Sequence, residues 1–244
     1  MRKSLVVSCW LLVVWLLGFG FWSFPDEVGA MGGPAPQKPG AQPSVSPGKV
    51  FLIDDFESGD LKSPREWWTF DIAKAAAVSS ANLRAGEKLD VGNYSLLLSG
   101  AAQNWYAGGC GTYLAKEGQD LSKYANFSVD LYGFGAGSGT LKAELYDDDN
   151  KNWQVEQDPA RSYSPIYDDK FTYEIRVDWI GWKRVSVPLA DFVDGNPGVG
   201  DDIWNPQPTG GSGGLLQLQF ISLTTKGKGK VNYYVDNVSL AMGE

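Results

Sequence analysis

Three carboxylates lie within four positions of the sequence, at Asp54, Asp55 and Glu57, directly after the apolar run 50–53. Carboxylates this close repel one another, and burial of the intervening Phe56 would take at least one of them out of water. Along an extended strand Asp55 and Glu57 share a face, whereas Asp54 points the other way. Because clustered carboxylates suit a hard cation, we expect Asp55 and Glu57 to be calcium ligands. The alternative is that these acids are strand-edge residues facing water.

The catalytic chemistry open to the chain is limited by its lack of histidine. Ser–His and Cys–His nucleophile pairs are excluded, as are histidine-based zinc and iron sites. No glycine-rich phosphate loop precedes a helix pattern. Glycoside hydrolysis needs only two carboxylates, but no pattern marks an acid and a nucleophile among the 29 acidic residues. We therefore expect a protein that is not an enzyme.

The charge of the chain argues against a nucleic-acid partner. Its formal net charge is −8, and its one basic cluster, "KGKGK" at 226–230, is interpreted as a solvated hairpin tip. Binding of phosphates requires a concentrated basic surface. We therefore expect no nucleic acid among its partners.

Residues 1–30 have the pattern of an export signal. Arg2 and Lys3 precede an apolar run from 5 to 24, and small residues before and at Ala30 suit cleavage there. The run is also long enough for an uncleaved membrane anchor. Both alternatives place the rest of the chain outside the cytoplasm, secreted, periplasmic or at the cell surface, because the positive charges stay inside. An uncleaved anchor would be the only membrane contact.

A linker and a single domain follow this segment. Residues 31–49 are rich in proline and glycine and lack apolar periodicity, as expected for a flexible tether. Residues 50–244 are of a suitable length for one domain. Cys110 is the only cysteine beyond position 9, so the domain has no internal disulfide, and we interpret it as a buried, inert thiol.

The domain reads as a series of short strands. Apolar and polar residues alternate with period two, and glycine, proline, asparagine and aspartate separate the runs. The predicted strands are 49–56, 94–100, 105–114, 127–135, 140–147, 172–179, 182–189, 215–223 and 230–240. Only a weak helical period appears, at 72–84. The pattern predicts an all-β fold, an antiparallel β-sandwich or jelly roll.

Five motifs occur in a characteristic order over residues 50–241. They are "DDFESGDL" followed by "WW", then "YSLLLSG", "DLSKYANFSVDLYG", "GWKRVSVPLADF" and "VNYYVDNVSL". Their order resembles a galactose-binding-like β-sandwich, the jelly roll of many carbohydrate-binding modules, and is most similar to the family 11 modules and their relatives. The same sandwich also carries assembly and filament-sheath functions, so the fold alone does not give the function.

The resemblance implies a sugar-binding groove on a concave sheet. Sugars stack their C–H faces on aromatic rings, and their hydroxyls pair with carboxylates, amides and guanidinium groups. Outward-facing strand residues and one loop tryptophan supply such groups: Asp130, Tyr132, Glu144, Tyr146, Trp153, Arg176, Asp178, Gln217 and Gln219. Trp105, Tyr163 and Tyr167 lie in or beside loops that could border the groove. The alternative is an ordinary solvated sheet face.

The segment 147–169 is long for a loop, and such loops are often functional. Its "DDDN" start resembles part of a calcium loop but lacks the glycine and terminal glutamate of an EF-hand. We therefore expect a solvated turn there.

In the sandwiches that the chain resembles, the first strand runs near the last. The last predicted strand carries Asp236 in "YYVDNV", which adds a third ligand to Asp55 and Glu57. A structural calcium ion would neutralise the repulsion and join the two ends of a domain that has no disulfide.

The sequence thus favours an exported, non-catalytic module that binds a polysaccharide or surface glycan. One alternative is a structural cell-surface or filament-sheath protein that uses the sandwich for assembly. Another is a small glycoside-active enzyme.

Overall fold

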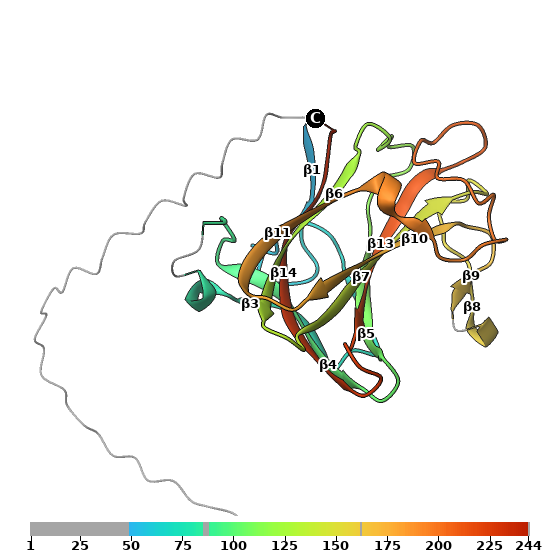
Figure 1. Ribbon diagram of the computed structural model, residues 1–244. Helices are drawn as coiled ribbons and strands as arrows, with labels where there is room; N and C mark the ends of the chain where they lie inside the picture. The colour runs from blue at the N-terminus through green and yellow to red at the C-terminus, as the bar shows by residue number, and fades with distance from the viewer. Residues whose placement is uncertain (1–48, 85–87, 162, 244) are drawn as a thin grey trace, which may run out of the picture. The chain divides into compact units, whose positions relative to one another are not determined.

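The computed structural model describes residues 49–84, 88–161 and 163–243, whose strands form two antiparallel sheets facing each other (Figure 1). Sheet A has the order β11-β6-β14-β4-β3, with β1 also paired to β14, and sheet B has the order β12-β10-β7-β13-β5-β2. The strands of sheet A are β1 (Val50–Asp54), β3 (Lys74–Ser79), β4 (Tyr94–Ala102), β6 (Asn126–Phe134), β11 (Ile180–Pro188) and β14 (Gly229–Ala241). Those of sheet B are β2 (Trp68–Phe70), β5 (Tyr106–Tyr113), β7 (Gly139–Asp148), β10 (Lys170–Val177), β12 (Val193–Asp194) and β13 (Gly214–Leu223). The predicted antiparallel β-sandwich is confirmed.

The remaining elements of the described residues are a short two-stranded ribbon and three 3₁₀ turns. A two-stranded ribbon, β8 (Gln157–Asp158) and β9 (Ser164–Pro165), lies in the long loop between β7 and β10. Three short 3₁₀ turns are η1 (Ala81–Leu83), η2 (Pro159–Arg161) and η3 (Leu189–Asp191). The weak helical period at 72–84 was a wrong indication, because this stretch forms β3 and η1. Its alanines pair with the apolar strand β4, for example Ala75 with Leu98.

The core lies between the two sheets and is built by the alternation seen in the sequence. On β7 the inward side chains Leu141, Ala143 and Leu145 are all fully buried. The indole of Trp67 stacks on Phe220 with ring centroids 5.5 Å apart, which connects the β2 region to β13. Cys110 is also fully buried, and burial raises the pKa of its thiol, in agreement with an inert residue.

The two ends of the domain lie side by side. β1 pairs with β14 from Val50 opposite Ala241 to Asp54 opposite Val238, and the Met242 amide donates to the Lys49 carbonyl at 2.9 Å. This is the adjacency of first and last strands that the resemblance implied.

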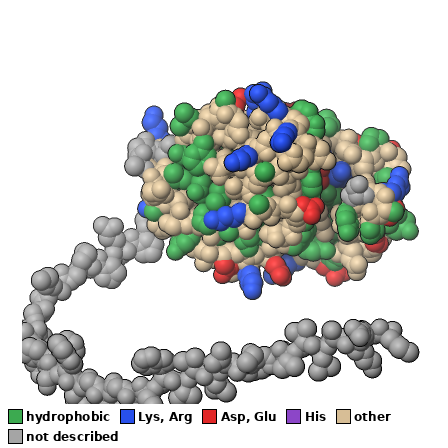
Figure 2. Space-filling model, turned by 90° about the horizontal axis from the view of Figure 1, so that it is seen from below, with side chains coloured by type: hydrophobic (Ala, Val, Ile, Leu, Met, Phe, Trp, Pro, Cys, Tyr) green, Lys and Arg blue, Asp and Glu red, His purple; other side chains and the backbone are tan. Residues whose placement is uncertain are grey.

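The predicted export segment and residues 31–48 of the linker lie outside the described residues. Within the part that the structure describes, no helix combines the length and apolar character needed to cross a membrane. On the face seen in Figure 2, lysine and arginine side chains are distributed among apolar and polar groups.

Candidate functional site

The outer face of sheet B is the strongest candidate for a binding surface. Strand register aligns its outward residues into four rows across the sheet. They are Tyr113–Gln217–Tyr146–Lys170, Trp68–Gly111–Gln219–Glu144–Thr172, Phe70–Gly109–Ile221–Lys142–Glu174 and Tyr106–Leu223–Thr140–Arg176. We call this surface the sheet B face.

Aromatic residues cover one side of the sheet B face because β5 carries glycine at alternate positions. A Cβ at Gly111 would lie 2.6 Å from the Trp68 ring, and one at Gly109 would lie 2.9 Å from the Phe70 ring. The two rings therefore lie directly over the β5 backbone. Tyr113 meets Trp68 edge to face at 5.5 Å and is 45% exposed, so a ring remains available at this edge.

The middle of the sheet B face is a floor of fixed polar groups. Gln217, Gln219, Glu144 and Tyr146 point away from the core, yet each is at most 7% exposed because neighbouring side chains cover them. The Tyr146 hydroxyl donates to Glu144 at 2.7 Å. The Glu144 carboxylate also forms an ion pair with Lys142 at 2.9 Å. This arrangement holds Glu144 as a hydrogen-bond acceptor of fixed orientation.

A surface pocket of about 360 Å³ lies at the other end of the sheet B face, where the fourth row ends. It is lined by Trp105, Thr140, Glu174, Arg176, Leu223, Thr224 and Thr225. Trp105 comes from the β4–β5 turn and is 55% exposed. The pocket thus combines an exposed indole with a guanidinium, a carboxylate and three hydroxyl groups.

The turn holds Trp105 by backbone hydrogen bonds on both sides. Its amide donates to the Gly227 carbonyl at 2.8 Å, and its carbonyl accepts from the Thr224 amide at 2.8 Å. The ring is therefore presented by two neighbouring connections between the sheets, β4–β5 and β13–β14, rather than by a free loop.

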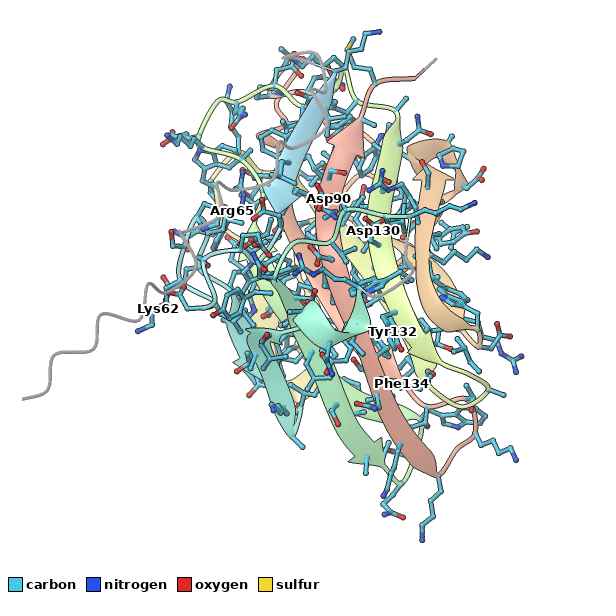
Figure 3. The ribbon with its side chains drawn as sticks, turned by 90° about the vertical axis from the view of Figure 1, so that its left-hand side faces the viewer. Lys62, Arg65, Asp90, Asp130, Tyr132 and Phe134 are labelled. Atoms are coloured by element: carbon cyan, nitrogen blue, oxygen red, sulfur yellow. The ribbon has the colours of Figure 1, made fainter. Side chains whose placement is uncertain are left out.

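The expectation that all candidate residues share one face is wrong for Asp130 and Tyr132. Both lie on β6 in sheet A, on the opposite side of the sandwich, as Figure 3 shows. Asp130 is fully buried in a bidentate pair with Arg184, at 2.8 and 2.7 Å. Tyr132 packs edge to face on Trp182 and Tyr234. Alternation along a strand predicts the inward or outward direction but does not predict which sheet the strand joins.

The remaining candidates divide between the sheet B face and its ends. Glu144, Tyr146, Arg176, Gln217 and Gln219 lie on the face as predicted. Asp178 follows β10 and forms an exposed ion pair with Arg176 at 3.3 Å. Trp153 lies in the loop beyond β7, where its amide donates to Asp148 at 2.8 Å.

Four aromatic residues of the sheet B face were missed by the sequence analysis, namely Trp68, Phe70, Tyr106 and Tyr113. The signal was present in "YAGGCGTY", where Gly109, Gly111 and Tyr113 alternate. Alternate glycines on one strand face leave room for large rings from the neighbouring strand.

The acids at the start of the domain are arranged differently from the expectation. β1 ends at Asp54 and Phe56 has a φ of 54°, so Asp55 and Glu57 do not share the face of an extended strand. Asp54 is the buried acid, and it accepts from the Trp67 indole and the Phe56 amide, both at 2.8 Å. These two hydrogen bonds therefore offset the loss of water around the buried Asp54 carboxylate.

Glu57 and Asp236 also have partners of their own. Glu57 accepts from the Asn93 and Tyr94 amides at 2.6 and 2.7 Å. Asp236 is buried and accepts from the Ser95 hydroxyl at 2.6 Å. Burial, with repulsion from Asp130 and Glu57, raises the pKa of Asp236 to about 8. Asp55, Glu57 and Asp236 do not form a ligand cluster in the structure, and calcium at this position stays a prediction.

The expected solvated turn at the start of the 147–169 loop is wrong. Asp147 and Asp148 are fully buried as the last residues of β7. Asp148 accepts from the amides of Asn152 and Trp153, so it fixes the start of the loop.

Comparisons with known proteins give similarity only among solved structures. No family model and no curated protein matches the chain. The family 11 carbohydrate-binding module of the cellulase Lic26A-Cel5E of Clostridium thermocellum is 18% identical, with a TM-score of 0.48 over 80% of this chain and 95% of that one. The family 30 carbohydrate-binding module of the Clostridium thermocellum cellulase Cel9D-Cel44B is 14% identical, with a TM-score of 0.46 over 80% of this chain and 99% of that one.

A third similar structure is an exo-beta-agarase. It is 14% identical, with a TM-score of 0.48 over 79% of this chain but only 25% of its own. At these identities and TM-scores, the function of the chain has to be argued from its own residues.

Proposed function

We propose that this protein is a non-catalytic module that binds a polysaccharide or surface glycan through the sheet B face. The observation that supports it is the pocket at Trp105, where an exposed indole lies beside Arg176, Glu174 and threonine hydroxyls. A sugar ring needs an apolar platform for one face and charged or hydroxyl groups for its edge. This pocket offers both within one surface.

The rest of the sheet B face suits an extended ligand rather than a single sugar. A second exposed ring, Tyr113, lies in the first row, and the Trp105 pocket lies beside the fourth. Between them the polar floor provides amides and a fixed carboxylate. The proposed ligand is therefore a chain of several sugar units that crosses the strands.

The similar solved structures include carbohydrate-binding modules of families 11 and 30, which agrees with the proposal without deciding it. The exported location, secreted, periplasmic or cell surface, belongs to the same proposal and rests on residues 1–30. The contacts of Glu144 with Tyr146 and Lys142 suit a binding role, because they fix the carboxylate as an acceptor.

A glycan array probed with the full-length protein tests this function. The array should give a polysaccharide ligand, and Trp105→Ala should weaken its binding about 5- to 160-fold, the effect of about 1 to 3 kcal/mol expected for a stacking ring. The matched control is Phe134→Ala, which removes a 47% exposed ring from sheet A. Equal losses in both variants, or no ligand on the array, would contradict the proposal.

A structural role in assembly is the second candidate, and the outer face of sheet A favours it. Ile180 is 81% exposed and Phe134 is 47% exposed, and they pair directly across β11 and β6. Exposed apolar residues that adjoin one another can mark a protein interface. Size-exclusion chromatography distinguishes the two functions, because assembly through this face would be lost in Phe134→Ala and kept in Trp105→Ala.

A further inference from the structure

A compact group of aspartates lies at the end of sheet B where β7 finishes and β10 begins. Asp147 lies at the end of β7 and Asp149 directly follows that strand. Asp169 directly precedes β10, which pairs with β7. One carboxylate oxygen from each of the three lies within 4.8 Å of the other two. Among the described residues, this is the one group of three or more acidic, histidine or cysteine side chains with that geometry.

Each of these carboxylates accepts a hydrogen bond from a backbone amide with one oxygen, and its other oxygen has no partner. Asp147 Oδ2 accepts from the Asn205 amide at 3.0 Å, and Asp169 Oδ2 accepts from the Ile203 amide at 3.1 Å. Asp149 Oδ2 accepts from the Asp169 amide at 2.9 Å. The Oδ1 atoms of all three aspartates are buried and form no hydrogen bond. Asp147 and Asp169 have no exposed surface at all.

Among the described residues, no lysine or arginine forms an ion pair with these three carboxylates. The ion pairs found among the described residues engage Glu144, Asp178 and Asp130 instead. Buried oxygens without donors are rare in native proteins and call for a missing partner.

We propose that Asp147, Asp149 and Asp169 bind a calcium ion, with the side-chain carbonyl of Asn205 as a further ligand. The Asn205 Oδ1 atom is also buried without a partner, and the backbone amide of Asn205 donates to Asp147 Oδ2. Carboxylate and amide oxygens are the ligands that calcium prefers, and it accepts six to eight of them in flexible geometry. Water or carbonyl oxygens complete the shell.

The backbone at Gly200 supports a dedicated site. A Cβ at this position would lie 2.3 Å from Asp149 Oδ2 and 2.4 Å from Asp169 Oδ1, so only glycine allows the chain to approach these carboxylates. The ion would join the end of β7, the start of β10 and the β12–β13 connection. This site is separate in sequence from Asp55, Glu57 and Asp236, for which the sequence predicted calcium.

Calorimetric titration of the full-length protein with calcium, after removal of bound metal by a chelator, tests the site. We expect a calcium-binding event and a melting midpoint that rises by about 5 to 10 °C at a calcium concentration near 100 times the dissociation constant. Asp169→Asn should lose both responses while remaining folded without calcium, because it removes one of the repelling charges.

Two matched controls locate the ion. Asp236→Asn changes another buried carboxylate, in the cluster first predicted from sequence, and should keep the response. Gly200→Ala should lose it, whereas Gly198→Ala should not. Both glycines have a left-handed backbone, with φ of 75° and 82°, but nothing lies within 4 Å of a Cβ at Gly198. The Gly198 variant therefore reproduces the backbone strain without filling the site.

Three results would overturn the proposal. They are the absence of any calcium-dependent change, a response retained by Asp169→Asn, and a response lost in Asp236→Asn but not in Asp169→Asn. Equal stabilisation by magnesium would overturn the assignment to calcium, because magnesium demands a smaller octahedral shell.

Discussion

Trp105 stands on a backbone with a φ of 76°, in the left-handed region that tryptophan rarely adopts. The conformation persists because Gly227 and Thr224 hold both of its peptide groups by hydrogen bonds. Strained residues of this kind cluster at binding sites, where a fixed orientation is useful. The strain at Trp105 is therefore in accord with its proposed contact to the ligand.

Relief of this strain gives the first prediction. Trp105→Gly should be more stable than Trp105→Ala by about 1 kcal/mol, because glycine adopts positive φ without a steric penalty. Both variants should lose glycan binding alike. Urea denaturation measures the stabilities, and equal stabilities in the two variants would show that the turn carries no strain.

The second prediction concerns Asp236, whose pKa is raised to about 8 in the folded protein from 3.8. At pH values between these two pKa values, the Asp236 carboxyl is ionised in the unfolded protein but still protonated in the folded protein. The contribution of Asp236 to the stability of the protein should therefore fall as the pH rises from about 4 through about 8. The Asp236→Asn variant lacks this titrating group. The stability of the variant minus that of the unsubstituted protein should therefore increase as the pH rises from about 4 to about 8.

Denaturant unfolding at several pH values, with calcium held in excess throughout, measures this difference. A constant difference between the two proteins across pH 4 to 8 would mean that Asp236 is ionised in the folded state. Asn237 and Ser95, which hydrogen-bond the carboxylate, should be left unchanged in the comparison.

At the scale of elements, β2 depends on the glycines of β5. Its three residues pair with β5 at the edge of sheet B, and Trp68 and Phe70 cover Gly111 and Gly109. A short edge strand gains little from backbone hydrogen bonds alone. The packing of the Trp68 and Phe70 rings against the glycine backbone of β5 therefore holds β2 in place.

The third prediction follows from that contact. Gly111→Ala should destabilise the protein by about 1 to 3 kcal/mol, because the methyl group would lie 2.6 Å from the Trp68 ring and force it away. Gly100→Ala in β4 is the control, since its nearest neighbour would be 3.4 Å away and its stability should hardly change. Similar unfolding midpoints for both variants would contradict the role given to Gly111.

Much of the strand pattern was predictable because alternation is a local property. The runs at 140–147 and 215–223 became β7 and β13 with ends that differ by at most one residue. β2 was missed because three residues show no period. The assignment of Asp130 to the binding face failed because the partner strands of β6 come from distant parts of the chain.

The aspartate cluster was hidden from the sequence for the same reason. Asp147 and Asp149 are close in sequence, but Asp169 and Asn205 join them only through strand pairing and a long connection. The sequence motif "DDDN" by itself did not contain enough ligands. A site assembled from three separate segments has no linear signature.

At the scale of the whole molecule, the core cluster is built from side chains of residues 53–240. We predict that removal of residues 1–48 leaves a folded monomer, because β1 begins at Val50 and every strand of both sheets remains. Size-exclusion chromatography and a cooperative thermal transition would check this. Aggregation of the truncated protein at neutral pH would contradict the boundary.

The pairing of β1 with β14 has a topological consequence. Lys49 and Met242 are joined by a hydrogen bond, so the chain leaves the sandwich at the point where it enters. Such a fold is nearly circular, and a short bridge between these residues would close it without disturbing a strand. New ends could then be opened at Gly118, in the turn between β5 and β6, where a Cβ would have no neighbour within 4 Å. The same proximity of ends would let the sandwich be inserted into a surface loop of another protein as a self-contained unit.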